Sequence, residues 1–126
     1  MRLICIGDSL TFGYGVHLSQ RWTQLCAQET GWELVNEGIN GDTTGGMLAR
    51  MQGGVLAELR EGGLGADRPY VLLMGGSNDV FYSGSDAAAR GNMGAMIHQL
   101  FSVGVLPMVG IPLPADCLLY TSDAAD

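Results

Sequence analysis

Four short apolar runs alternate along the chain with longer segments, and this alternation limits the possible fold more than any other feature. The runs cover residues 2–6, 32–36, 69–74 and 105–111, and glycine or proline follows each within a few positions. Runs of this length are typical of buried strands closed by turns. The connections between them are long enough for crossover helices. The sequence therefore predicts an α/β fold whose parallel sheet is covered by helices on both faces.

Each connecting segment carries a helix signal. The first predicted helix ends at Gly31, a residue suited to a helix C-terminus, and its spacing is carried by Trp22, Leu25, Cys26 and Glu29. The second follows the N-cap residues 42–44, although a glycine pair at 53–54 weakens its middle, and one face of it carries Met47, Leu48, Met51 and Val55. The third begins near residue 86, and its apolar stripe consists of Met93, Met96, Ile97, Leu100 and Phe101.

Length and hydropathy favour one soluble domain. The chain has 126 residues, and none of its charge-free apolar runs approaches the ~20 residues that a membrane-spanning helix needs. The apolar stretch at the amino terminus ends at residue 6, which is too short for the core of a signal peptide. We therefore expect a cytoplasmic protein without stable membrane insertion.

Charge and cysteine content exclude several classes of function. The net charge is −7 and the sequence contains no lysine, which argues against binding to nucleic acid and against a Walker A phosphate loop. The three cysteines (Cys5, Cys26 and Cys117) show no paired short spacing. An odd number of unpaired cysteines is typical of free thiols in a reducing compartment, so neither a disulfide framework nor a zinc site is expected.

Small polar residues follow three of the predicted strands, at residues 7–10, 40–42 and 76–79. The carboxyl ends of parallel strands meet at one edge of a sheet, and ligands bind outside that edge. We therefore expect the three clusters to form one site.

These clusters contain the groups that acyl transfer requires. Ser9 lies on a tight turn after the first strand and can act as a nucleophile, while its own backbone N–H can bind an oxyanion. Gly41 can bring a second backbone N–H close, because no Cβ obstructs the approach. The side-chain amide of Asn78 is a third candidate donor. Asp8 either orients the turn or caps it, and Asp42 and Asp79 are interpreted mainly as helix or turn caps.

The same segments resemble a known family in three places. Residues 6–11 (IGDSLT), 36–44 (NEGINGDTT) and 75–79 (GGSND) are similar, in order, to three sequence blocks of the SGNH/GDSL hydrolases. Residues 111–114 (IPLP) resemble a proline-bearing segment of the branch that includes thioesterase I and lysophospholipase L1. The resemblance runs from residue 1 to about residue 116. It implies a three-layer, flavodoxin-like α/β/α fold that is incomplete at its C-terminus.

The resemblance also implies a chemistry. Ser9 would be the nucleophile, and Gly41 and Asn78 would bind the oxyanion. The expected reaction is hydrolysis of a small-molecule carboxylic ester or thioester through an acyl-serine intermediate, with no cofactor. The sequence leaves the acyl and alcohol specificity and the oligomeric state open.

The family's fourth block, Asp-x-x-His, supplies the base and the acid that orients it, and this sequence has no such motif. Residues 117–126 are unlike the family and resemble a translated sequencing adapter, so we expect them to be an artefactual tail on a truncated domain. His17 and His98 are the only histidines; the first is a weak candidate for a substitute base and the second is expected to be structural. The fragment is therefore expected to be inactive and poorly soluble.

Two other functions are compatible with the sequence. Asp8, Asp42 and Asp79 could gather around Mg²⁺ in a metal-dependent phosphohydrolase, although the second aspartate of a D-x-D motif is absent. A non-catalytic fragment or binding module is the third hypothesis.

Overall fold

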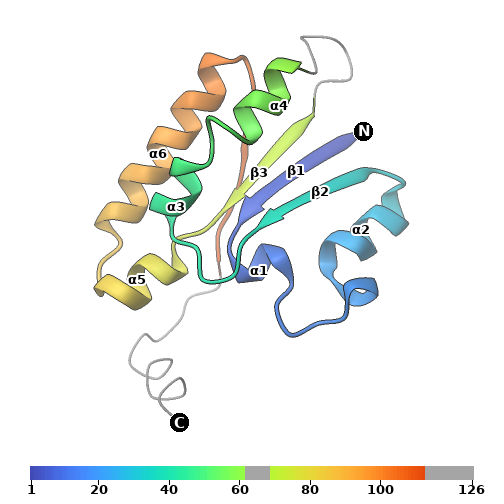
Figure 1. Ribbon diagram of the computed structural model, residues 1–126, viewed down its shortest axis with the longest axis horizontal. Coiled ribbons are helices and arrows are strands. Elements are labelled where there is room, and N and C mark those ends of the chain that lie inside the picture. Colours follow the sequence, from blue (N-terminus) through green and yellow to red (C-terminus); the bar gives the residue numbers. More distant parts are fainter. Residues whose placement is uncertain (62–68, 113–126) are drawn as a thin grey trace.

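The computed structural model describes residues 1–61 and 69–112, and a parallel sheet runs through the centre of this part of the chain (Figure 1). The strands are β1 (Arg2–Gly7), β2 (Glu33–Gly38), β3 (Tyr70–Met74) and β4 (Met108–Gly110). Their order across the sheet is β2-β1-β3-β4, and every neighbouring pair is parallel. The predicted α/β class and parallel sheet are confirmed.

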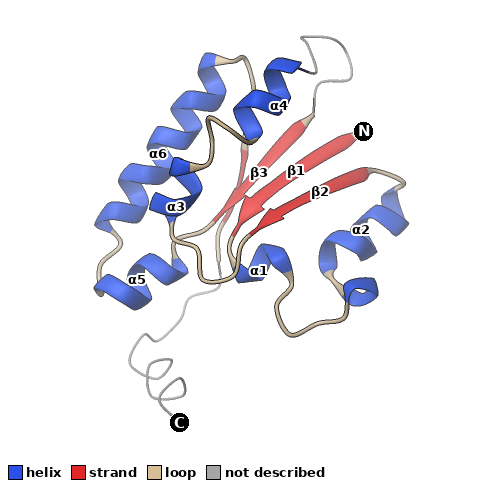
Figure 2. Ribbon diagram, in the orientation of Figure 1, coloured by secondary structure: helices blue, strands red, loops and turns tan. Residues whose placement is uncertain are grey.

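Helices lie on both sides of this sheet (Figure 2). One side carries α3 (Thr44–Ala49), α4 (Val55–Glu61) and α6 (Ala87–Ser102). The other side carries α1 (Ser9–Phe12), α2 (Trp22–Thr30) and the 3-10 turn η1 (Leu18–Gln20). The short helix α5 (Ser77–Ser83) directly follows β3. Sequence analysis missed α1, η1 and α5, because each lies in a polar or glycine-rich stretch with little apolar periodicity.

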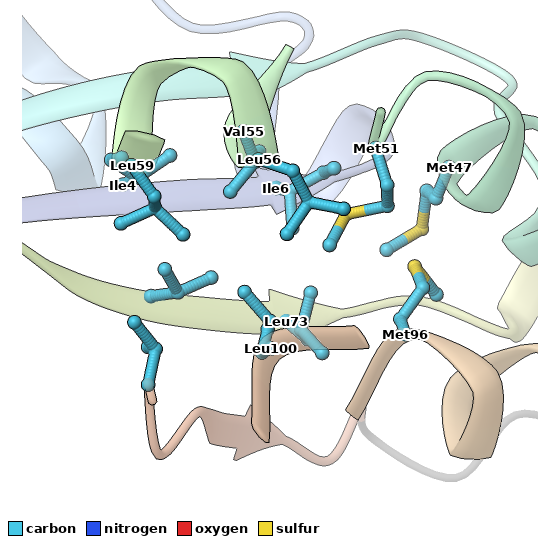
Figure 3. Close-up of a cluster of buried hydrophobic side chains, with 12 residues drawn as sticks. Ile4, Ile6, Met47, Met51, Val55, Leu56, Leu59, Leu73, Met96 and Leu100 are labelled. Atoms are coloured by element: carbon cyan, nitrogen blue, oxygen red, sulfur yellow. The ribbon is translucent and has the colours of Figure 1, made fainter. Parts of the chain in front are cut away.

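The main hydrophobic core lies between the sheet and α3, α4 and α6. Figure 3 shows Ile4 and Ile6 of β1 and Leu73 of β3 facing side chains of these helices. The buried cluster consists of Ile4, Ile6, Met47, Met51, Val55, Leu56, Leu59, Val71, Leu73, Met96, Leu100 and Val105. Burying one such side chain stabilises a fold by about 1.5–3 kcal/mol, so this cluster is the main source of stability in the described part.

The helix predicted across residues 47–55 is two helices, which corrects the sequence analysis. α3 ends at Ala49, and α4 begins at Val55 after a turn. Gly53 and Gly54 are poor helix formers, at about 1 kcal/mol each, and the N–H of Gly54 donates to the carbonyl of Arg50 at 3.1 Å. The turn still leaves the predicted apolar residues Met47, Met51 and Val55 buried.

The first predicted helix ends where expected, with Gly31 in the left-handed conformation and its N–H bonded to the carbonyl of Ala27. Of the residues near this spacing, Leu25 is exposed, whereas Thr23 is buried. The reason is a polar contact, because the side-chain amide of Asn36 on β2 donates to Oγ1 of Thr23 at 3.2 Å.

Two predicted strands have different limits in the structure. The strand expected at 32–36 spans Glu33–Gly38, because it pairs residue by residue with the whole of β1. The strand expected at 105–111 is only Met108–Gly110. Its first residues instead close the end of α6, where the N–H of Val105 donates to the carbonyl of Leu100 at 2.9 Å. The predicted stripe of α6 is correct except at Phe101, which is exposed.

The second face of the sheet is covered over β1 and β2, where α1 and α2 pack. Tyr70 of β3 and Met108 of β4 point to the same face and are 46% and 44% exposed. Helices therefore cover both faces of the sheet, as predicted, and on this face they pack against β1 and β2.

Two further expectations concern membranes and thiols. Among the described residues, no helix has the length and apolar character needed to cross a membrane. Cys5 and Cys26 are free thiols, as predicted, and burial raises the pKa of Cys5 to about 12. Cys117 and the predicted tail at 117–126 lie outside the described residues.

The core makes a direct stability prediction. Leu73→Ala removes a fully buried side chain beneath α6 and should lower the free energy of unfolding by about 2–5 kcal/mol. Leu106→Ala is the matched control, because Leu106 is 73% exposed and its loss should change stability by less than about 0.5 kcal/mol. Urea unfolding followed by circular dichroism measures both variants. Equal effects would contradict the assignment of the core.

Candidate active site

The strand register brings the three predicted clusters to one edge of the sheet. Gly7, the last residue of β1, pairs with Gly38 at the end of β2 and with Met74 at the end of β3. The loops that carry Ser9, Gly41 and Asn78 therefore begin at the same level. The predicted convergence of these clusters is confirmed, whereas the chemical roles of the three residues stay predictions.

Ser9 begins α1 on a tight turn after β1 and is half-buried. Oδ1 of Asp8 accepts a hydrogen bond from the N–H of Leu10 at 2.9 Å, so Asp8 is the N-cap of this helix. The carbonyl of Asp8 also accepts from the N–H of Phe12 at 2.9 Å. Gly7 is required before the turn, because a Cβ there would overlap Oγ1 of Thr11. These contacts fix the backbone on both sides of Ser9.

Gly41 lies in the loop after β2 and has a φ of +78°, which favours glycine. The loop is held by two backbone hydrogen bonds, from Ile39 to the carbonyl of Gly7 and from Asp42 to the carbonyl of Ile39, both at 3.1 Å. Among the described residues, and apart from the two chain neighbours of Gly41, the only atom within 4 Å of the position where a Cβ would stand is the hydroxyl of Tyr82, at 3.8 Å. A ligand can therefore approach this backbone closely.

Asn78 connects the second and third clusters. It is the second residue of α5, and its Nδ2 donates to the carbonyl of Asp42 at 2.9 Å. A side-chain amide carries two N–H hydrogens, so one is used in this bond and the other can serve a ligand. The same bond fixes the orientation of the amide beside the loop that carries Gly41.

Asp79, the neighbour of Asn78, is buried and has a structural role. Its Oδ1 accepts from the N–H of Thr44 at 2.8 Å, and its Oδ2 accepts from Oγ1 of Thr44 at 2.6 Å. Nδ2 of Asn92 on α6 donates to the same hydroxyl at 3.1 Å. Asp79 therefore caps the start of α3 from a distant part of the chain, in agreement with the predicted capping role.

Sequence analysis missed Arg50, whose side chain forms hydrogen bonds to three residues at this edge of the sheet. Its guanidinium donates to the carboxylate of Asp42 and to the backbone carbonyls of Gly7 and Glu37. One signal could have revealed it: Arg50 is a lone charge between apolar residues 48 and 51 of a predicted inward face. A cavity of about 280 Å³ lies beside it and is lined by Ile6, Glu37, Ala49, Arg50, Gly53, Gly54 and Val55.

Three carboxylates lie near one another here, and their environments differ. Burial is the main cause of a raised pKa at Asp8; the nearby charges of Asp42 and Asp79 add to it, whereas the hydrogen bond from Leu10 opposes it. Asp42 is paired with Arg50, and Asp79 is bonded to Thr44. Within the part of the chain that the structure describes, no group of three or more His, Cys, Asp or Glu side chains could hold a metal ion.

Neither histidine forms a hydrogen bond with Ser9 in the described part of the chain. His17 is exposed and precedes η1, and His98 is exposed on α6, which covers the opposite face of the sheet from α1. Across residues 1–61 and 69–112, no hydrogen bond joins either imidazole to Ser9. The described residues therefore supply a hydroxyl and N–H donors at one edge, with no histidine hydrogen-bonded to the hydroxyl.

The raised pKa of Asp8 predicts how stability depends on pH. Folding favours the protonated Asp8 carboxyl, so this group contributes most to the free energy of unfolding below its pKa in the unfolded chain, about 3.8. The contribution is lost as the pH rises through the higher pKa of the folded chain. Asp8→Asn keeps an acceptor for Leu10 but carries no charge. The variant should therefore gain stability over the natural chain as the pH rises from about 3 to about 7.

Urea unfolding across this pH range measures the difference. Asp86→Asn is the matched control, because Asp86 is exposed at the start of α6. A gain in stability for Asp8→Asn that is the same at every pH would contradict a buried Asp8 carboxyl with a raised pKa.

Comparison with known proteins identifies the family. The sequence model of the GDSL-like lipase/acylhydrolase family matches residues 5–125. Esterase TesA of Pseudomonas aeruginosa is 29% identical over 119 residues, which cover 89% of this chain and 55% of that protein. The chain thus spans about half the length of this curated relative. The predicted division at residues 116–117 stays a prediction, since it falls outside the described residues.

Solved structures agree with this match. The crystal structure of TesA has a TM-score of 0.74 at 29% identity, covering 90% of this chain and 62% of that one. A lipolytic protein of the G-D-S-L family from Desulfitobacterium hafniense has a TM-score of 0.77 at 24% identity, covering 98% and 71%. The esterase AlinE4, described as an SGNH hydrolase, has a TM-score of 0.73 at 24% identity, covering 94% and 61%. The chain belongs to the GDSL-like lipase/acylhydrolase family and has the SGNH-hydrolase fold.

Proposed function

We propose that the protein hydrolyses carboxylic esters or thioesters through an acyl intermediate on Ser9. The observation that carries this proposal is the common edge shared by the Ser9 turn, the Gly41 loop and Asn78, in a member of a lipase/acylhydrolase family. The curated relative is named an esterase, which supports the same reaction class. The substrate is a small acyl ester or thioester, and the acyl chain is not specified.

The proposed reaction has two steps. Oγ of Ser9 attacks the carbonyl carbon of the substrate and gives its proton to a base, while the carbonyl oxygen becomes an oxyanion. The backbone N–H groups of Ser9 and Gly41 and the second amide N–H of Asn78 bind that oxyanion. The alcohol or thiol then leaves with a proton. Water attacks the acyl-serine in the second step, which releases the acid and restores the hydroxyl.

The base is the part of this proposal that the described residues do not supply. Both histidines are exposed, no hydrogen bond joins either imidazole to Ser9 within residues 1–61 and 69–112, and the sequence has no Asp-x-x-His motif. We therefore assign neither the base nor its orienting acid to the described residues. The chain by itself should hydrolyse esters only slowly, because an oxyanion hole without a base retains a small part of the catalysis.

An external base can test Ser9 in the chain as it stands. A fluorophosphonate probe, with imidazole added to accept the proton, should phosphonylate Ser9, and mass spectrometry of the peptides locates the label. Ser9→Ala should abolish this label, whereas Ser102→Ala, at the exposed end of α6, should leave it unchanged. A labelling rate that does not depend on imidazole, or a label that persists in Ser9→Ala, would contradict the assignment of Ser9 as the nucleophile.

The oxyanion role of Asn78 makes a second prediction. The phosphonyl oxygen of the probe takes the place of the oxyanion, so Asn78→Ala should lower kinact by about 10²–10³-fold while KI changes little. Gln52→Ala is the control, because Gln52 is an exposed amide in the turn before α4. A change confined to KI would assign Asn78 to probe binding and not to the oxyanion.

A further inference from the structure

We propose that Arg50 is a positioning residue for acyl transfer. Its guanidinium holds three backbone segments in one arrangement and thereby sets the spacing between the N–H groups of Ser9 and Gly41. The inference rests on the proposed function of Ser9 and adds a residue that touches no substrate.

The contacts of Arg50 reach every part of the edge between β1 and β2. Nη2 donates to the carbonyl of Gly7 at 2.8 Å, and Nη1 donates to the carbonyl of Glu37 at 2.6 Å. Nε donates to Oδ2 of Asp42 at 3.0 Å, and Nη2 lies 2.9 Å from the same oxygen. The first two acceptors lie at the ends of β1 and β2, and the third lies directly after Gly41.

Two of these acceptors, Gly7 and Asp42, are coupled to donors of the proposed site. Gly7 is separated from Ser9 by a single residue, and its carbonyl also accepts from the N–H of Ile39 in the loop that leads to Gly41. The backbone carbonyl of Asp42 accepts from the amide of Asn78. Because one guanidinium binds both Gly7 and Asp42, it links the Ser9 turn to the Gly41 loop and to the Asn78 amide.

The geometry requires a guanidinium and not merely a positive charge. Arginine presents five donors in a rigid plane, which lets one side chain serve a carboxylate and two carbonyls that lie in different directions. A lysine ammonium has a single nitrogen, so it cannot reach all three acceptors that the guanidinium serves from three separate nitrogens. The ion pair is also sheltered, with the side chains of Arg50 and Asp42 only 23% and 14% exposed, so water replaces it poorly.

A purely structural role must be separated from positioning. Arg50 is also the C-cap residue of α3, so its removal could loosen that helix alone. Loss of structure would lower the amount of active protein, whereas loss of positioning would lower the rate of each active molecule. The second effect appears as a fall in kinact at unchanged KI, measured on protein whose unfolding temperature shows that it is folded.

The experiment compares Arg50→Lys and Arg50→Ala in the imidazole-assisted phosphonylation of the full 126-residue chain. Both variants should lose about 10²-fold in kinact with KI unchanged, as expected for a misplacement of about 1 Å at the reacting centre. Methylguanidinium should restore part of the rate in Arg50→Ala, because the adjoining cavity of about 280 Å³ gives it access to the vacated position. Arg90→Ala is the control, since Arg90 forms an exposed pair with Asp86, and its rate should not change.

The outcomes decide the proposal in each case. A wild-type kinact in Arg50→Lys would overturn the proposal. So would a loss of kinact in Arg50→Ala that equals the unfolded fraction of that variant and that methylguanidinium does not reverse. If the natural chain itself is not labelled at Ser9, the proposed function fails, and amide hydrogen exchange then tests positioning alone. In Arg50→Ala the amides of Ile39 and Asp42, which are hydrogen-bonded in the loop that carries Gly41, should exchange at least tenfold faster than in the natural chain, with that of Met96 unchanged. Unaltered exchange at Ile39 and Asp42 would overturn the proposal.

Discussion

The parallel pairing of β1 with both of its neighbours is the constraint on which the rest of the structure depends. The pairing places Gly7, Gly38 and Met74 side by side, so three loops leave the sheet at one level. It also directs Ile4 and Ile6 to the face that α3, α4 and α6 cover. The same register thus fixes the core on one face and collects the polar clusters at one edge.

The loops at this edge are held by hydrogen bonds between residues far apart in the sequence. Asn78 binds the carbonyl of Asp42, Asp79 binds the backbone and hydroxyl of Thr44, and Arg50 binds the end of β1. Buried polar groups are costly unless they are paired, so these bonds stabilise the loops and restrict them to one arrangement. An oxyanion site needs such restriction, because its donors must stand in place before charge develops.

Membership of the lipase/acylhydrolase family and the geometry of this edge support the same chemistry from independent directions. The chain spans 55% of the esterase that it matches and provides a serine hydroxyl and candidate donors. In the proposed mechanism the described residues bind and stabilise the oxyanion, and the base that takes the proton is not assigned among them. Cytoplasmic location stays a prediction.

The sequence by itself determined the alternation of strands and helices, the family and the three polar clusters, because short apolar runs and small residues act through local backbone preferences. It did not reveal that a glycine pair divides α3 from α4, that Thr23 and not Leu25 faces the sheet, or that Val105 closes α6. Only the tertiary structure decided these features and the contacts of Arg50. The Thr23 contact and the two carbonyl contacts of Arg50 depend on partners that lie 13 to 43 positions away in the chain, whose positions no local pattern encodes.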